Sequence, residues 1–182
     1  MIVGGGTLSY YLAKILLSMK IRVLIVESNA ARCEQLSELL PDATIIHGDG
    51  TDKNLLLEEG LTRVESFVTL TNLDEENILL SLFAKKNSTA KLVSKVNRIA
   101  FDDIIEGLDI GSVIYPKYIT ADYILQYVRA MQNSIGSNVE TLYQILDNKA
   151  EALEFSIHDD CPFLNIPLAD LDIRDNPLSC LH

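Results

Sequence analysis

The chain has 182 residues, of which 48% are hydrophobic, and 15 basic against 26 acidic side chains give it a net charge of −11. This length suits one full domain and part of a second, with enough apolar residues for a packed core. An acidic chain without a basic cluster is a poor binder of nucleic acid or of an anionic membrane surface, and no apolar stretch is long enough to cross a bilayer.

The cysteines and the N-terminus indicate where the protein works. Cys33, Cys161 and Cys180 have unrelated spacings that match no metal or redox motif, which is typical of a reducing compartment. The apolar N-terminus lacks the basic leader of a signal peptide. We therefore expect a cytoplasmic protein.

The first elements along the chain predict a βαβ unit. Ile2–Val3 forms a short strand, Gly4–Gly6 a turn, and Thr7 to Met19 a helix with an apolar face. A second strand, Arg22–Val26, ends directly before Glu27. A strand, a glycine turn that opens a helix, a second strand and a terminal acid are the order of a dinucleotide-binding unit.

Each position of this motif has a physical role. Gly4 allows the tight turn, and Gly6 lets the backbone approach a pyrophosphate at the positive end of the helix. Glu27 accepts hydrogen bonds from an adenosine ribose and repels a 2′-phosphate. The third fingerprint position is Ser9 rather than glycine, but serine is small enough for close packing of helix and strand. The alternative is a flexible turn that binds nothing.

Strands and helices continue to alternate for about two thirds of the chain. The predicted elements are a helix capped by Asn29 that runs through Leu40, the strand Thr44–His47, the helix Lys53–Glu59, the strand Ser66–Leu70, a helix from Asp74 to Lys85, the strand Lys91–Val96, the helix Phe101–Glu106, the strand Ser112–Tyr115 and the helix Ile119–Met131. This alternation predicts a Rossmann-like, doubly wound parallel sheet with helices on both faces.

The sequence changes character near Gln132. Residues 1–131 form the predicted nucleotide-binding domain, and residues 132–138 form a polar linker. Val139–Leu146 and Ala150–Ile157 then predict a β-hairpin. A hairpin and one helical turn cannot enclose a core, so residues 139–182 are expected to be the start of an incomplete α+β lobe.

Further candidate ligand residues follow the later strands. Because the carboxyl ends of parallel strands meet at one edge of the sheet, Asp49, Thr71 and Asp74 are expected to lie near the ligand, with Lys95 and Arg98 as the cations facing the cleft. Asp74 is also interpreted as a helix N-cap, and helix-dipole stabilisation is sufficient for Glu75 and Glu76. No nucleophile–base pair or metal cluster is visible, so we predict no catalytic and no metal-binding residues.

Several segments, in this order, resemble the RCK family, also called KTN or TrkA. They are Ile2-Val3-Gly4-Gly5-Gly6-Thr7-Leu8-Ser9-Tyr10-Tyr11-Leu12-Ala13, Val26-Glu27, His47-Gly48-Asp49-Gly50-Thr51, Val68-Thr69-Leu70-Thr71-Asn72-Leu73-Asp74-Glu75-Glu76-Asn77 and Lys95-Val96-Asn97-Arg98. The glycine motif alone is common to many enzymes, whereas the later segments at this spacing are much more specific. Residues 161–168 resemble the start of the family's C-terminal lobe.

The resemblance implies a cytosolic, non-catalytic regulator of a potassium uptake transporter or channel. The implied ligand is NAD or NADH, with ADP or ATP as the alternative, bound by Gly4, Gly5, Gly6, Thr7, Leu8, Ser9, Glu27, Asp49, Thr71, Asn72, Asp74, Lys95 and Arg98. Thr7 stands where ATP-binding relatives often carry an arginine, which favours NAD or NADH.

The resemblance also implies the partners. These are a membrane potassium transporter or channel subunit, which would hold the protein at the inner face of the membrane without inserting it, and a second copy of the chain. In the family, the helix equivalent to Ile119–Met131 crosses to the partner subunit of a dimer, which can extend into a ring. The alternative for this helix is packing on its own sheet.

Two other functions remain open from the sequence. One is an NAD-dependent oxidoreductase fragment that lacks its substrate domain. The other is a unit that has lost its nucleotide and serves as a scaffold in a ring.

Overall fold

The computed structural model of the protein describes residues 1–98, 102–133, 139–145, 150–155 and 166–167. It divides into two compact units, Met1–Thr120 and Ala121–His182. The first unit contains the predicted α/β domain and is the part that forms the site described below.

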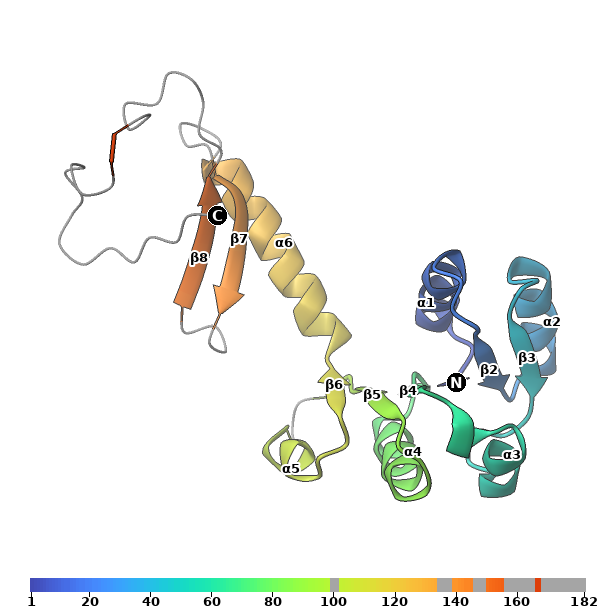
Figure 1. Cartoon of the computed structure of the whole chain (residues 1–182). Helices are drawn as coiled ribbons and strands as arrows, with labels where there is room; N and C mark the ends of the chain where they lie inside the picture. Colours follow the sequence, from blue (N-terminus) through green and yellow to red (C-terminus); the bar gives the residue numbers. More distant parts are fainter. Residues whose placement is uncertain (99–101, 134–138, 146–149, 156–165, 168–182) are drawn as a thin grey trace. The chain divides into compact units, whose positions relative to one another are not determined.

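A six-stranded parallel sheet forms the centre of the first unit (Figure 1). Its strands are β1 (Ile2–Val3), β2 (Leu24–Glu27), β3 (Thr44–His47), β4 (Ser66–Thr69), β5 (Lys91–Lys95) and β6 (Ser112–Ile114). They are arranged in the order β3-β2-β1-β4-β5-β6. This is the order of a doubly wound Rossmann sheet, with the direction of winding reversing between β1 and β4. The predicted fold class is confirmed.

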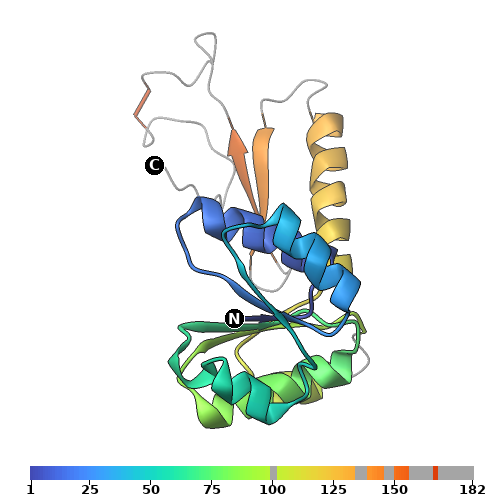
Figure 2. The same ribbon diagram turned by 90° about the vertical axis from the view of Figure 1, so that its right-hand side faces the viewer.

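Helices cover both faces of this sheet. They are α1 (Thr7–Ser18), α2 (Ala30–Leu39), α3 (Lys53–Glu58), α4 (Asp74–Asn87) and α5 (Asp102–Gly107), with a short 3₁₀ turn, η1, at Leu61–Arg63. Figure 2 shows α1 and α2, in blue, on one side of the sheet and α3, α4 and α5, in teal to yellow-green, on the other. This arrangement follows from right-handed crossovers that leave β1 in opposite directions.

Consecutive residues of the central strands supply two separate cores, because side chains alternate between the faces of a strand. Ile2 and Ile25 are buried in a cluster with Leu36 of α2. Val3 and Val26, the next residues, are buried in a second cluster with Phe67. Burial of each such side chain contributes roughly 1.5–3 kcal/mol.

The apolar face of α1 is only partly buried. Ser9 and Ala13 are the buried residues of the helix, whereas Tyr11 and Ile15 are 57% and 58% exposed. Small residues face the sheet because the helix lies close to it. Among the larger apolar side chains of α1, Tyr10, Leu12, Leu16 and Leu17 pack partly buried against the core, so only part of the predicted apolar face is exposed.

Most predicted elements are confirmed, with ends that differ by one or two residues. The clearest difference is the last helix, α6 (Pro116–Asn133), which begins at Pro116 rather than at Ile119. Proline is favoured in the first turn of a helix because it has no N–H to leave unpaired. Phe101, at the start of the predicted fifth helix, and residues 134–138 of the predicted linker lie outside the described residues.

The second unit contains the predicted hairpin. Strands β7 (Val139–Ile145) and β8 (Ala150–Phe155) pair in antiparallel fashion, with a register irregularity between Val139 and Thr141. Residues 146–149, which connect the two strands, are outside the described part of the chain.

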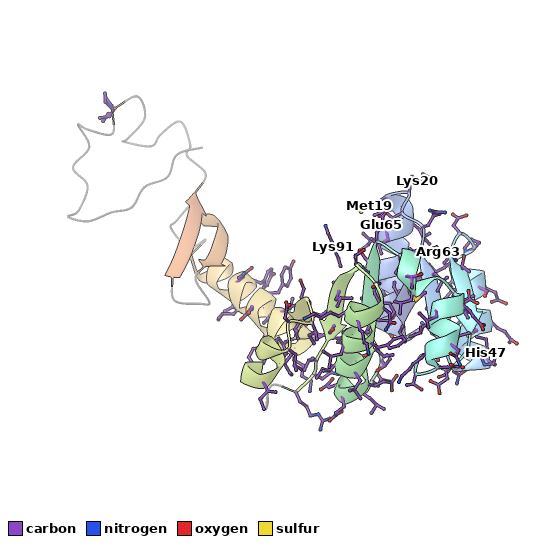
Figure 3. All side chains as sticks on the ribbon, turned by 60° about the horizontal axis from the view of Figure 1, so that its bottom comes forward. Met19, Lys20, His47, Arg63, Glu65 and Lys91 are labelled. Carbon is purple, nitrogen blue, oxygen red and sulfur yellow. The ribbon has the colours of Figure 1, made fainter. Side chains whose placement is uncertain are left out.

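The carboxyl ends of the strands define one end of the first unit. In Figure 3, His47, the last residue of β3, lies at the opposite end from Glu65 and Lys91, which lead into β4 and β5. The loops that follow β1, β2, β3 and β4 therefore gather at the His47 end. Among the described helices, none combines the length and the apolar character needed to span a bilayer.

Candidate functional site

The turn after β1 requires glycine at its first position. Gly4 has a φ of +96°, and a Cβ on it would lie 3.0 Å from backbone atoms of Leu70 and Thr71. Its N–H donates to the carbonyl of Val26 at 2.8 Å. A side chain here would be strained by the dihedral angle and would push apart β1 and β4. The predicted role of Gly4 in a tight turn agrees with this geometry.

The N-terminus of α1 is open to a ligand. Gly6 is the N-cap residue, makes no side-chain cap and has an extended backbone. A Cβ on Gly6 would meet no atom within 4 Å. The amide groups of the first turn of α1 are therefore available to an anion, which the positive end of the helix also attracts.

Ser9 explains why the third glycine of the fingerprint can be replaced. Its side chain is fully buried, and its hydroxyl donates to the carbonyl of Gly4. The serine thus keeps the close packing of α1 on the sheet and adds a bond that closes the turn. Thr7 and Leu8, which were also predicted as ligand residues, are exposed at the start of α1.

Glu27, the acid at the end of β2, is tied to the glycine turn. Its Oε2 accepts from the N–H of Gly5 at 2.6 Å, and its Oε1 accepts from the N–H of Asn29 at 2.7 Å. A Cβ on Gly5 would lie 2.8 Å from Oε2. The carboxylate is therefore held in one position between the glycine turn and the start of α2, where its remaining lone pairs can accept from hydroxyl groups.

Arg32 is part of this arrangement, and the sequence analysis missed it. From the first turn of α2, its Nε donates to the carbonyl of Gly5 at 2.7 Å, and its Nη2 donates to that of Gly6 at 3.4 Å. The guanidinium thus binds the carbonyl groups of the turn. The only signal in the sequence is an arginine five residues after Glu27, in the first turn of the predicted helix, where an exposed arginine is ordinary.

A cavity of about 440 Å³ lies between these loops. It is lined by residues at the carboxyl ends of four strands, namely Val3, Gly4, Gly5, Gly6, Val26, Glu27, Ser28, Asp49, Gly50, Leu70, Thr71, Asn72, Leu73 and Glu76. The volume falls in the range of small-molecule sites, and the position is the switch point at which doubly wound sheets bind ligands. Seven of the predicted ligand residues therefore meet around one cavity.

Two acids besides Glu27 line the cavity, namely Asp49 and Glu76. Both hydrogen bonds to Asp49, from the N–H and the hydroxyl of Thr51, reach Oδ1 at 2.8 Å. These bonds hold the pKa of Asp49 below its ordinary value. The pKa of Glu76 is raised, first by burial and then by the charge of Asp49. Glu76 is thus more than the helix-end acid that the sequence analysis assigned.

Asp74 does not cap α4, contrary to the sequence interpretation. The N-cap position is Leu73, which makes no side-chain bond. The buried Asp74 carboxylate instead accepts from the N–H groups of Asn97 and Arg98, at 2.9 and 3.0 Å. Burial raises the pKa of Asp74, but these bonds and the charge of Arg98 outweigh it, so the net pKa is lowered. The sequence around a helix start cannot show whether an acid caps that helix or accepts hydrogen bonds from a loop 23 residues further along the chain.

The two predicted cations lie outside the residues that line the cavity. Lys95 is buried, its Nζ donates to the carbonyl of Leu70 at 3.4 Å, and burial lowers its pKa against the raising effect of Asp74. Arg98 is exposed and pairs with Glu75 at 2.7 Å. Lys95 thus joins the end of β5 to Leu70, the residue after β4. Arg98 joins the loop after β5 to α4.

The side chain of Asn77 joins the end of β4 to β5 by hydrogen bonds. Its side chain is fully buried, and Oδ1 accepts from both the N–H and the hydroxyl of Thr71 at 2.9 Å. Its Nδ2 donates to the carbonyls of Thr71 and Lys95, at 3.2 and 2.9 Å. One amide therefore uses all its hydrogen-bonding capacity to join the end of β4 to β5.

The sheet order and the site at its switch point define a Rossmann-type α/β domain of the nucleotide-binding kind. Residues 1–116 match the family model of the TrkA-N domain. The chain therefore belongs to the TrkA-N domain family, and the predicted family resemblance is confirmed.

Curated relatives carry the same domain in longer chains. The chain is 36% identical over 159 residues to the Trk system potassium uptake protein TrkA of Halomonas elongata, covering 87% of this chain and 33% of that protein. It is 32% identical over 166 residues to TrkA of Haemophilus influenzae, covering 91% and 35%. The chain thus spans about a third of the length of these relatives.

Solved structures share the fold at low sequence identity. The TrkA-N domain of the inner membrane protein ybaL from Escherichia coli superposes with a TM-score of 0.62 at 15% identity, over 68% of this chain and 91% of that one. The GsuK channel bound to NAD superposes with a TM-score of 0.62 at 18% identity, over 80% and 25%. These similarities confirm the fold.

Replacing Asn77 with alanine should destabilise the first unit by roughly 2–3 kcal/mol, because it leaves buried backbone groups of Thr71 and Lys95 without partners. The matched control is Asn87→Ala in the same helix. Within the described part of the chain, the Asn87 side chain makes a single hydrogen bond, to the carbonyl of Phe83, so this variant makes the same chemical change in the same helix at the loss of one bond. Chemical denaturation of both variants measures the difference, and equal losses of unfolding free energy would contradict the role given to Asn77.

Proposed function

We propose that the chain binds NAD or NADH at this cavity and acts as the nucleotide-sensing domain of a potassium uptake regulator. The observation that carries the proposal is the Glu27 carboxylate, held against the Gly5 amide beside the uncapped N-terminus of α1. Such a pairing provides, next to each other, an anion site for a pyrophosphate and an acceptor for ribose hydroxyls.

The residues around the cavity fit each part of a dinucleotide. The amides at the start of α1 would receive the pyrophosphate, with Gly6 leaving room for its approach. Glu27 would accept from the two hydroxyls of the adenosine ribose, and its charge would oppose a 2′-phosphate. The nicotinamide supplies hydride chemistry in enzymes, but as a sensor this chain would need only to bind and release it.

Charge favours a ligand with few phosphates. The charged side chains that line the cavity are Glu27, Asp49 and Glu76, and no lysine or arginine is among the described lining residues. Arg32 lies beside the glycine turn, but its guanidinium donates to the carbonyls of Gly5 and Gly6. Each additional phosphate would therefore meet carboxylates and no cation among the described lining residues. This supports NAD or NADH over NADP and over ATP.

The link to potassium transport rests on the relatives. The curated proteins that match are Trk system potassium uptake proteins, and the GsuK channel has been solved bound to NAD and to ADP. We propose that the chain likewise works beside a membrane transporter or channel subunit, at the inner face of the membrane. A nucleotide would act there by binding one conformation better than another, which shifts the balance between states of the pore.

We propose no catalysis for this chain. Among the described residues that line the cavity there is no cysteine or histidine, and the serine among them, Ser28, makes only a 3.5 Å contact with the Glu27 carboxylate. That carboxylate is itself held by the N–H groups of Gly5 and Asn29. The oxidoreductase alternative would need a substrate domain outside these residues. Regulation requires only the differential binding described above.

The proposed assembly uses α6. Six apolar residues in the described part of this helix are more than two fifths exposed, namely Tyr118, Ile119, Tyr123, Ile124, Tyr127 and Val128. A monomer rarely keeps so continuous an apolar face in water. A second copy of the chain, placing its own α6 against this one, would cover it.

Titration calorimetry with NADH, NAD, NADP and ATP tests the ligand. We expect NADH or NAD to bind more tightly than NADP and ATP. Glu27→Ala should weaken NADH binding by roughly 1–3 kcal/mol, the usual cost of unpaired polar groups, and should narrow the preference for NAD over NADP.

The control for Glu27→Ala is Glu38→Ala, an exposed acid of α2 outside the cavity lining. It should bind all four nucleotides as the wild type does. Tighter binding of NADP than of NAD by the wild-type chain would overturn the role given to Glu27.

Sedimentation tests the assembly. The wild-type chain should sediment as a dimer at micromolar concentration, and Tyr123→Glu with Tyr127→Glu should make it monomeric by placing charge on the apolar face. Tyr11→Glu, which changes a similarly exposed tyrosine of α1, should leave the dimer intact. A wild-type monomer would rule out the α6 interface.

A further inference from the structure

The backbone of Gly5, in the middle of the glycine turn, is held by side chains from one short segment of the chain, residues 27–32. The N–H of Gly5 donates to Oε2 of Glu27 at 2.6 Å, and the carbonyl of Gly5 accepts from Nε of Arg32 at 2.7 Å. Both backbone polar groups of this glycine are therefore bound by charged side chains, one at the end of β2 and the other in the first turn of α2.

These contacts belong to a closed ring of hydrogen bonds. Oε1 of Glu27 accepts from the N–H of Asn29 at 2.7 Å, and Oδ1 of Asn29 accepts from the N–H of Arg32 at 2.9 Å. The guanidinium of Arg32 then returns to Gly5, while its Nη1 donates to Gln35 in the same helix. The backbone and the guanidinium of Arg32 are therefore both fixed relative to the turn.

The bond to Arg32 sets the direction of the peptide group that joins Gly5 to Gly6. The peptide groups of the turn are trans, so the C=O and the N–H of each group point in opposite directions. The Gly5 carbonyl points at Arg32, which is not a lining residue of the cavity, whereas Gly5 and Gly6 are. The N–H of Gly6 therefore points away from Arg32, and it has no acceptor in the described part of the chain.

The next peptide group, which joins Gly6 to Thr7, is held in the same direction. The carbonyl of Gly6 accepts from the N–H of Tyr10 at 3.1 Å and, over a longer distance of 3.4 Å, from Nη2 of Arg32. The N–H of Thr7 opens α1, where a helix offers no acceptor for it. Two successive N–H groups, those of Gly6 and Thr7, are thus turned away from the guanidinium and left for a ligand.

Without such contacts the turn would have little preference for this orientation. Glycine populates positive and negative φ about equally. Packing restricts Gly4, as described above, but a Cβ on Gly6 would meet no atom within 4 Å. A guanidinium opposes rotation of the peptide group because it carries only donors, and an inverted group would place an N–H against them.

We infer that Arg32 is a positioning residue of the nucleotide site, which binds the carbonyls of Gly5 and Gly6 and thereby aims the N–H groups of Gly6 and Thr7 at the pyrophosphate. This inference rests on the proposed function and states how the anion site of that function keeps its orientation. Arg32 acts here without touching the ligand, because each of its three guanidinium nitrogens already donates to the turn or to Gln35.

Arginine is the residue type suited to this task. Hydrogen bonds from an ionised donor are roughly twice as strong as those between neutral groups. The planar guanidinium also presents its donors in a rigid fork, which can reach two neighbouring carbonyl groups at once. A lysine would carry the same charge as a single point on a flexible stem, so it cannot hold both peptide groups in the same way.

The first measurement tests the orientation on the full chain without ligand. Residual dipolar couplings of the isotope-labelled chain report the direction of each backbone N–H bond. In the wild type, the couplings of Gly6 and Thr7 should fit the directions described above. In Arg32→Ala they should shrink toward an average, because the turn then samples several orientations. Unchanged couplings in the sheet show that the fold is retained.

The second measurement is calorimetric titration with NAD. Arg32→Ala should bind NAD about tenfold more weakly, the loss expected when the binding-competent orientation falls to about a tenth of the population. Arg32→Lys keeps the charge without the fork, so it should stay closer to Arg32→Ala than to the wild type in both measurements. The matched control is Arg22→Ala, which removes an exposed arginine that precedes β2 at the opposite end of the sheet, and it should behave as the wild type.

The outcomes separate this inference from the proposed function. A wild-type chain that does not bind NAD overturns the proposed function and, with it, the role of the turn in binding. Unchanged couplings of Gly6 and Thr7 in Arg32→Ala overturn the inference alone; a loss of NAD affinity beside them would assign Arg32 to direct contact with the ligand. Wild-type affinity in Arg32→Lys also overturns the inference, by assigning the effect of Arg32 to its charge.

Discussion

The hydrogen bond from the Gly5 amide to the Glu27 carboxylate joins the turn after β1 to the end of β2. It can form because the backbone of Gly4 takes a φ of +96° and packs directly on Leu70 and Thr71. The same turn sets the start of α1, whose first amides have no side-chain cap. The position of the cavity, the exposure of the first amides of α1 and the orientation of Glu27, the proposed ribose acceptor, all depend on this one close approach.

At the carboxyl ends of β4 and β5, polar side chains add to the backbone ladder and the apolar packing that join the two strands. Asn77 binds the end of β4 and the carbonyl of Lys95, and Asp74 binds the amides of Asn97 and Arg98. A ligand that shifted Thr71 would have to break or move these bonds. Movement of the cavity wall is therefore coupled physically to the loop after β5, which is the kind of connection that a nucleotide sensor needs.

The sequence predicted the fold and the turn after β1 because both depend on local patterns. Alternating strands and helices determine the sheet, and the tight turn at Gly4 and the Asn29 cap have short-range signals that the structure bears out. The ligand roles of Gly4, Gly6 and Glu27 stay predictions. Asp74 was wrongly assigned as an N-cap, and the position of Glu76 at the cavity was not predicted, because acids at the start of a helix look alike in sequence. Their different roles come from the loops after β5 and β3, whose approach only the tertiary structure determines. Arg32 was missed for the same reason.

A crystal structure of the chain with bound NAD tests the central claim most directly, because the claim states where each part of the dinucleotide lies. The account predicts the pyrophosphate at the N-terminus of α1, against Gly5 and Gly6, and the adenosine ribose hydroxyls on the Glu27 carboxylate. A dinucleotide bound elsewhere, or one whose pyrophosphate lies away from the glycine turn while Glu27 contacts no ribose, would contradict it.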